Sequence, residues 1–230
     1  MTNFSKFEKK LKISFENQAL LFEALTHRSY LNENPSWGYP HNERLEFLGD
    51  AVLELAVTDH LFRNFPDKPE GDLTSIRAAL VNASMLATVA TEIGINDVVL
   101  LSRGEAKDVG RARASILANA FEALVGALYL DGGYPAADAF IQRQLIPKTA
   151  DILEKKLFRD AKSVFQEKAQ EMAALTPAYR VQKEWGPDHD KHFVVGAYIG
   201  EELIGEGEGP SKQIAEQNAA ENALRAKDWQ

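Results

Sequence analysis

Residues 41–55, with the sequence HNERLEFLGDAVLEL, constrain the fold of this chain more than any other stretch. At about 100° per residue on an α-helix, Glu43, Glu46 and Asp50 fall within roughly 60° of one another. Three carboxylates therefore share one stripe, and the apolar side chains of the segment point elsewhere. The pattern predicts a core helix that carries an acidic stripe.

The acidic stripe has two interpretations. Like charges at this spacing repel and raise one another's pKa unless a positive group lies between them, and the stripe carries no Lys. A divalent cation held by oxygen ligands would relieve the repulsion. A solvated acidic face is the alternative, because acids at a helix start complement its dipole, and Asn42 is a plausible N-cap. Spacing alone leaves both open.

A second acidic position lies in the strongly apolar segment 115–130, which we expect to be a helix. Glu122 is the one acidic side chain in this segment, and an unpaired carboxylate there is costly. Asn119 lies one turn earlier on the same face. These two residues are candidates for the second half of a polar site.

The segment Asn42–Asp50, NERLEFLGD, resembles the signature of ribonuclease III, the double-stranded-RNA endonuclease. Residues 24–30, ALTHRSY, also resemble that family near its first helices. The resemblance implies an all-α catalytic domain and metal-dependent cleavage to 5′-phosphate and 3′-hydroxyl ends. It further implies a homodimer that processes ribosomal RNA precursors and other structured transcripts.

The resemblance also implies which residues carry the chemistry. Mg²⁺ is the expected cofactor, and Mn²⁺ is expected to substitute for it. The implied metal ligands are Glu46, Asp50, Asn119 and Glu122; the expected catalytic pair is Asp50 and Glu122, supported by the acids Glu43 and Glu70. The family has Asp where this chain has Asn119, and the lost charge predicts a weaker affinity for Mg²⁺.

Several residues keep two interpretations. Glu70 either belongs to the acidic cluster or complements a helix dipole in a first turn. Arg111 and Arg113 are either solvated or in contact with phosphate. Phe47 is either a dimer contact or a core residue. We expect His27 to be packed or hydrogen-bonded and not to act as a base.

Periodicity predicts helices over residues 6–11, 18–26, 43–62 and 73–91, with Asp72 as the N-cap of the last. A loop is expected from Asn32 to Pro40. Asp131, Gly132 and Gly133 should end the helix 115–130, and Pro135 suits the start of another.

The last part of the chain follows a different pattern. Helices are expected over 161–174 and 211–226, with strands over 179–183, 193–199 and 202–206 between them. This α-β-β-β-α order resembles a double-stranded-RNA-binding domain, as do the segments 165–167, 177–179, 186–189 and 207–212. Such a domain reads the shape of duplex RNA across two minor grooves. By position, the expected RNA contacts are Gln166, Gln170, His189, Ser211 and Lys212.

The expected fold class is therefore multidomain, with an all-α ribonuclease III endonuclease domain followed by an α+β domain of the order α-β-β-β-α. We place a catalytic domain at residues 1–154, a short linker at 155–159 and the RNA-binding domain at 160–228. Residues 1–158 and 159–230 each carry a net charge of −4, so RNA binding has to rest on local patches. Double-stranded-RNA-binding domains usually have a basic residue where this chain has Gln213, so we expect modest RNA affinity with a shallow salt dependence.

Composition excludes several classes of protein. The chain has no cysteine, which excludes disulfide scaffolds, thiolate zinc sites and a cysteine nucleophile. No secretion signal and no uninterrupted apolar run near ~20 residues is visible, so we expect a cytoplasmic protein without a membrane partner or small-molecule cofactor. The rival functions are a catalytically weak RNA-binding module, motivated by Asn119, and a ribosome-associated scaffold.

Overall fold

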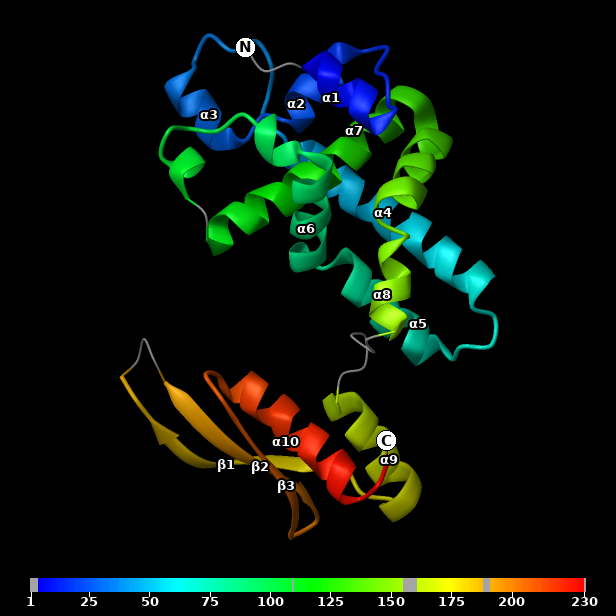
Figure 1. Cartoon of the computed structure of the whole chain (residues 1–230), viewed down its shortest axis with the longest axis vertical. Helices are drawn as coiled ribbons and strands as arrows, with labels where there is room; N and C mark the ends of the chain where they lie inside the picture. The colour runs from blue at the N-terminus through cyan, green and yellow to red at the C-terminus, as the bar shows by residue number, and fades with distance from the viewer. Residues whose placement is uncertain (1–3, 109, 155–160, 188–190, 230) are drawn as a thin grey trace. The chain divides into compact units, whose positions relative to one another are not determined.

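The computed structural model describes residues 4–108, 110–154, 161–187 and 191–229. Backbone contacts divide the chain into two units, residues 1–158 and 159–230 (Figure 1). The expected linker 155–159 lies outside the described residues.

The described part of the first unit is built from helices. They are α1 (Phe4–Leu11), α2 (Gln18–Ala24), α3 (Arg28–Glu33), α4 (Glu43–Asn64), α5 (Glu70–Val81), α6 (Ala83–Ile93), α7 (Arg111–Gln144) and α8 (Lys148–Glu154), with short 3₁₀ turns η1 (Ile95–Asp97) and η2 (Glu105–Lys107). Helix α7 runs through the unit and packs against α4 and α6 (Figure 1). The all-α prediction for this part of the chain is confirmed.

Helix α7 is long and apolar enough to cross a membrane by length and composition, but most of it is buried inside the unit. That burial is typical of a core helix. Its regular geometry breaks at Gly133, which has φ 72° and ψ −176°, followed by Pro135. The predicted break at Gly133 is therefore present. The Asp131 carboxylate just before it accepts the backbone N–H groups of Glu16 and Asn17, at 2.9 and 2.8 Å.

The single helix expected over 73–91 is wrong, because Asn82 divides it into α5 and α6. Asn82 is extended (φ −70°, ψ 154°), and its side-chain oxygen accepts the backbone N–H of Met85, 2.9 Å away. Asn is favoured at an N-cap because it satisfies such a free N–H, and here that preference outweighs the apolar periodicity.

Of two predicted N-caps, Asp72 is wrong, and Asn42 occupies the N-cap position of α4 without a capping bond from its side chain. Helix α5 begins at Glu70 after Pro69, so Asp72 lies in its first turn. Asn42 precedes α4, but its side chain is buried and donates to the carbonyl of Ala24, 3.2 Å away. Asn42 therefore ties the start of α4 to α2.

The second unit has the order α9 (Ala161–Ala173), β1 (Ala178–Trp185), β2 (His192–Ile199), β3 (Glu202–Gly209) and α10 (Lys212–Ala226). The strands form an antiparallel sheet in the order β1-β2-β3. Its core joins Phe165 of α9 and Ala197 of β2 to a row of small residues on α10, namely Ala219, Ala220 and Ala223. The predicted α-β-β-β-α layout is confirmed.

Candidate active site and RNA-binding surface

A close crossing of α4 and α7 positions the acidic residues. Gly49 of α4 and Gly126 of α7 lie at the crossing, where a Cβ on Gly49 would overlap the carbonyl oxygen of Glu122 and one on Gly126 that of Leu45. Only glycine permits this approach of two helix backbones. Because Gly49 lies between Glu46 and Asp50 in sequence, the crossing sets both beside the α7 segment that carries Glu122.

Charge repulsion and burial act together on the resulting acids. Partial burial and, to a smaller extent, the nearby charges of Asp50 and Glu46 together raise the pKa of Glu122 to about 7. Burial also raises the pKa of Glu46, with added repulsion from Glu43 and Asp50. A hydrogen bond from Asn119 opposes that rise. The structure thus places Glu46, Asp50 and Glu122 within electrostatic reach of one another, with Asn119 hydrogen-bonded to Glu46.

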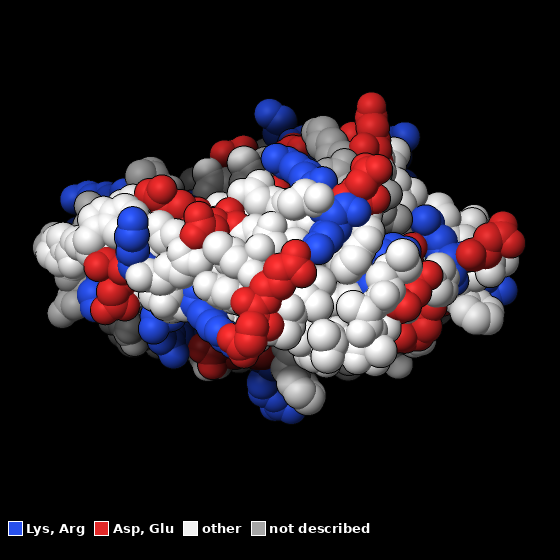
Figure 2. Space-filling model, turned by 90° about the horizontal axis from the view of Figure 1, so that it is seen from below, with Lys and Arg blue, Asp and Glu red and all other residues white. Residues whose placement is uncertain are grey.

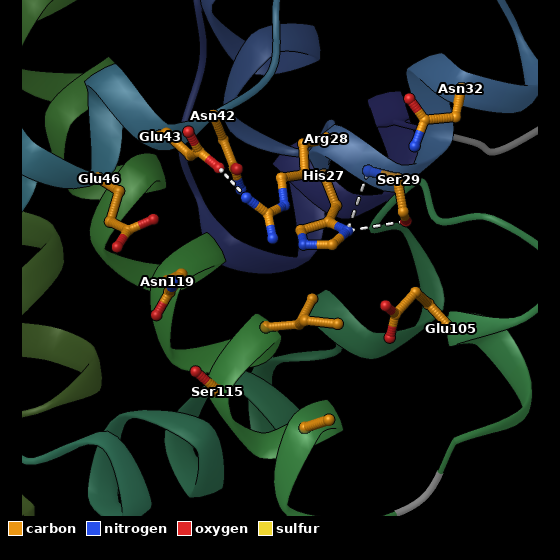
Figure 3. Close-up of a pocket in the computed structure, with 12 residues that line it drawn as sticks. His27, Arg28, Ser29, Asn32, Asn42, Glu43, Glu46, Glu105, Ser115 and Asn119 are labelled. Atoms are coloured by element: carbon orange, nitrogen blue, oxygen red, sulfur yellow. Dashed lines mark hydrogen bonds and ion pairs between the residues drawn. The ribbon is translucent and has the colours of Figure 1, made fainter.

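Of these four residues, Glu46 and Asn119 line a pocket of about 750 Å³, whereas Asp50 and Glu122 are not among its lining residues (Figure 3). Helices α3 and α4 with the residues just before them, helix α7 and the turn η2 supply its lining residues: His27, Arg28, Ser29, Asn32, Asn42, Glu43, Glu46, Glu105, Ala112, Ser115, Ile116 and Asn119. In Figure 3 the side chains of Glu46 and Asn119 lie together on one side of the pocket, and His27 and Glu105 lie on the other. The pocket offers space for a polar ligand next to the carboxylates.

The donor set fits a divalent cation in its chemistry. Carboxylate and amide oxygens are the ligands that Mg²⁺ prefers, and burial together with mutual repulsion raises the pKa of both Glu46 and Glu122. Within the described parts of the chain, however, no three Asp, Glu, His or Cys side chains converge closely enough to hold one ion.

The two supporting acids occupy different places. Glu43 lines the pocket, 3.5 Å from Arg28 and 3.8 Å from His41. Glu70 begins α5 and accepts a hydrogen bond from Thr74 at 2.8 Å, beside a separate cavity of about 250 Å³. The structure therefore does not bring Glu70 into the pocket with Glu43.

His27 is hydrogen-bonded, as expected. It precedes α3 as the N-cap, and its Nδ1 accepts the backbone N–H of Ser29 at 3.3 Å and lies 2.8 Å from the Ser29 hydroxyl. Burial lowers the pKa of His27, so the ring is neutral at pH 7. Arg113 also has a structural partner, because it donates to the side chain and carbonyl of Asn96. Arg111 is exposed at the first position of α7.

Phe47 is not a core residue. Its side chain is 83% exposed, and it lines a surface hollow with Leu20, Leu48 and Leu130. Leu55 and Phe62 follow Phe47 along α4 at helical spacing and are 58% and 73% exposed. These three residues form the apolar stripe of α4.

In the second unit, the structure places the described RNA-contact candidates on two helices. Gln166 and Gln170 are exposed one turn apart on α9, where they line one surface hollow. Ser211 caps α10 by accepting the backbone N–H of Ile214 at 3.3 Å, and Lys212 begins that helix with its Nζ 5.6 Å from the Phe193 ring centre. His189 lies outside the described residues. Basic and acidic side chains are interspersed on the face shown in Figure 2.

Sequence reasoning did not identify several lining residues of the pocket, among them Arg28, Glu105 and Ser115. Ser115 precedes Asn119 by one turn of α7, so helical spacing was a signal for it. Arg28 and Glu105 belong to α3 and η2, and their place beside the pocket depends on tertiary packing.

Comparisons with known proteins agree with this architecture. The family model described as Ribonuclease-III-like matches residues 17–149, and the double-stranded RNA binding motif matches residues 161–227. Ribonuclease 3 of Borreliella burgdorferi is 44% identical over 98% of this chain and 91% of its own length. Ribonuclease 3 of Pelotomaculum thermopropionicum is 46% identical over 95% of this chain and 91% of its own length.

A solved structure agrees as well. The nuclease domain of ribonuclease III from Campylobacter jejuni, described for flexibility in a region involved in dimer formation, is 40% identical with a TM-score of 0.57. The match covers 63% of this chain and 99% of that domain. From its sequence, its helical unit and the RNA-binding motif that follows, this chain belongs to the ribonuclease III family of double-stranded-RNA endoribonucleases.

Proposed function

We propose that this chain cleaves duplex RNA by Mg²⁺-dependent hydrolysis, with Mn²⁺ able to substitute, and leaves 5′-phosphate and 3′-hydroxyl ends. Ribosomal RNA precursors and other structured transcripts are its proposed substrates, and the cytoplasm its location because such RNAs occur there. Residues 1–154 form the catalytic domain, 155–159 the linker and 160–228 the RNA-binding domain. The proposal rests chiefly on the carboxylates of α4 and α7 that share one charge environment.

Glu46, Asp50, Asn119 and Glu122 are the proposed holders of the cation. A bound Mg²⁺ activates water, stabilises charge on the phosphate and assists the departing oxygen. Glu122 has to lose its proton before it can bind a cation, and its pKa of about 7 makes that loss complete only above neutral pH. Asp50 and Glu122 are the proposed catalytic pair, and Glu43 and Glu70 support them.

The second unit supplies contacts with the RNA duplex. Gln166 and Gln170 suit a minor groove, because amides hydrogen-bond to ribose hydroxyls and base edges. Ser211 and Lys212 lie at the N-terminus of α10, where free N–H groups and the helix dipole favour phosphate. His189 is proposed to reach a second minor groove.

A homodimer is the proposed assembly, with each subunit cutting one strand. The apolar stripe of α4, which comprises Phe47, Leu55 and Phe62, is the proposed contact. Exposed aromatic and aliphatic side chains in a row mark an association surface more often than isolated ones do.

Cleavage of an end-labelled RNA duplex tests the proposed function. We expect cleavage by the wild type with Mg²⁺ or Mn²⁺, no cleavage with a chelator, and none by Glu122→Ala. Glu16→Gln, which alters an exposed carboxyl outside the pocket, is the matched control and should cleave normally. A gel shift without cleavage under all metal conditions would instead support an RNA-binding module.

A further inference from the structure

The pocket beside the candidate active site is strongly acidic. Three carboxylates line it, those of Glu43, Glu46 and Glu105. Among its described lining residues, Arg28 carries the one permanent positive charge, because the neighbouring His27 is neutral at pH 7. An RNA phosphate that enters such a pocket is repelled by the carboxylates, so it needs a cationic group within reach.

The guanidinium of Arg28 is available for a ligand. Its Nη1 lies 3.5 Å from a carboxylate oxygen of Glu43, which is an ion pair longer than a good hydrogen bond. Its side chain is 71% exposed, and the structure describes no hydrogen bond from it to a protein acceptor. Figure 3 shows the guanidinium between Glu43 and His27, directed into the pocket.

A second arginine of the same unit shows the contrast. Arg63 on α4 is equally exposed, at 72%, but its Nε donates to both oxygens of Asp59 at 2.8 Å. That pair occupies the guanidinium, and Arg63 does not line the pocket. Exposed ion pairs contribute little to stability. The Arg28–Glu43 pair is therefore not needed to stabilise the fold, and Arg28 can serve another purpose.

We propose that Arg28 binds a phosphate of the RNA strand in this pocket, and that Glu43 acts as a positioning residue that holds the Arg28 side chain at the pocket rim. The inference deepens the proposed function and rests on it. A guanidinium suits the role because its fixed fork of N–H donors matches phosphate oxygens in two simultaneous hydrogen bonds. Glu43 then supports the reaction through Arg28 and is not itself a metal ligand.

Binding of a short RNA duplex, measured by fluorescence anisotropy in EDTA, tests the role of Arg28 apart from metal and cleavage. We expect Arg28→Gln to weaken binding about tenfold, as for one lost hydrogen bond between charged groups. Arg63→Gln is the matched control and should bind within about twofold of the wild type. Thermal unfolding of the Arg28→Gln protein should be unchanged. Wild-type affinity in Arg28→Gln overturns the proposal.

A single uncharged methylphosphonate, moved along the duplex, identifies the phosphate that Arg28 contacts. At one linkage this substitution should weaken binding by the wild type and have no further effect on Arg28→Gln. When two changes are not additive, here the Arg28→Gln substitution and the removal of one phosphate charge, the two groups are in direct contact. If Arg28→Gln and the wild type respond alike at every linkage, Arg28 touches no phosphate.

Glu43→Gln separates a positioning role from metal binding. We expect a raised KM for duplex RNA and an unchanged Mg²⁺ midpoint, because Arg28 loses its anchor while the metal ligands stay intact. Arg28→Gln combined with Glu43→Gln should bind RNA no more weakly than Arg28→Gln alone. A higher Mg²⁺ midpoint in Glu43→Gln would show a metal ligand and refute the positioning role. Absence of metal-dependent cleavage in the wild type would refute the proposed function and leave the binding result in EDTA intact.

Discussion

Replacement of Glu122 by Gln should make the metal-free nuclease unit more stable at alkaline pH. Burial and the charges of Asp50 and Glu46 raise the pKa of Glu122 from 4.5 to about 7. The folded state therefore binds a proton between these pH values that the unfolded chain has released. Stability conferred by the neutral carboxyl is fully present below pH 4.5 and is lost as the pH rises through 7.

The pKa difference sets the size of the effect. At about 1.4 kcal/mol per pH unit, the full linkage energy is roughly 3 kcal/mol. Glu122 is only partly buried, and solvent screening reduces this to about 1–2 kcal/mol. For a domain of this size, that energy corresponds to about 3–6 °C in Tm.

Differential scanning calorimetry without divalent cations, at equal protein concentrations from pH 4.5 to 8.5, measures the effect. The difference in Tm between Glu122→Gln and the wild type should be near zero at pH 4.5, grow through pH 7 and stay constant above. Glu16→Gln should show no such growth. Adding Mg²⁺ should stabilise the wild type more than Glu122→Gln, because ligands stabilise the state that binds them.

A difference in Tm that does not depend on pH would refute this reasoning. It would mean that Glu122 titrates in the folded protein as it does in the unfolded chain. The charge coupling between α4 and α7 would then be absent, and with it the physical basis for a cation site.

Four further outcomes are expected. Asn119→Asp should lower the Mg²⁺ concentration for half-maximal cleavage by adding a negative ligand, and identical metal curves would contradict this. Gly126→Ala should lower the free energy of unfolding in urea by at least about 1–3 kcal/mol, because the added Cβ overlaps the backbone of Leu45. Gly71→Ala, whose added Cβ meets open space, should have no such effect, and equal effects would argue against the close crossing. Phe47→Arg should give monomers in analytical ultracentrifugation, and a persistent dimer would exclude the contact at Phe47. RNA affinity of the wild type should fall only slowly with salt, and a steep slope would show many phosphate contacts.

The sequence predicted the elements better than their boundaries. Periodic apolar residues located α4, α7 and the α-β-β-β-α unit, because burial of one helix or sheet face is encoded locally. The division of 73–91 at Asn82 was missed, since a capping side chain there competes with a continuous apolar pattern. Asn42 occupies the predicted N-cap position, but its side-chain amide donates to the carbonyl of Ala24, a contact that only the folded chain creates.

Part of the site was predictable because the spacing of residues along one helix is encoded locally. Glu46 and Asp50 share a stripe by spacing, and Glu122 is conspicuous in an apolar helix. Their proximity depends on the crossing at Gly49 and Gly126, which no spacing rule contains. The approach of Arg28 to α4 likewise results from tertiary packing.

The location of a bound cation tests the central claim most directly. Crystals of the protein soaked in Mn²⁺ give an anomalous signal that identifies the ion independently of activity. We predict a peak between α4 and α7, within coordination distance of Glu46, Asp50 and Glu122. Manganese bound only elsewhere, with these three carboxylates left free, would contradict the account.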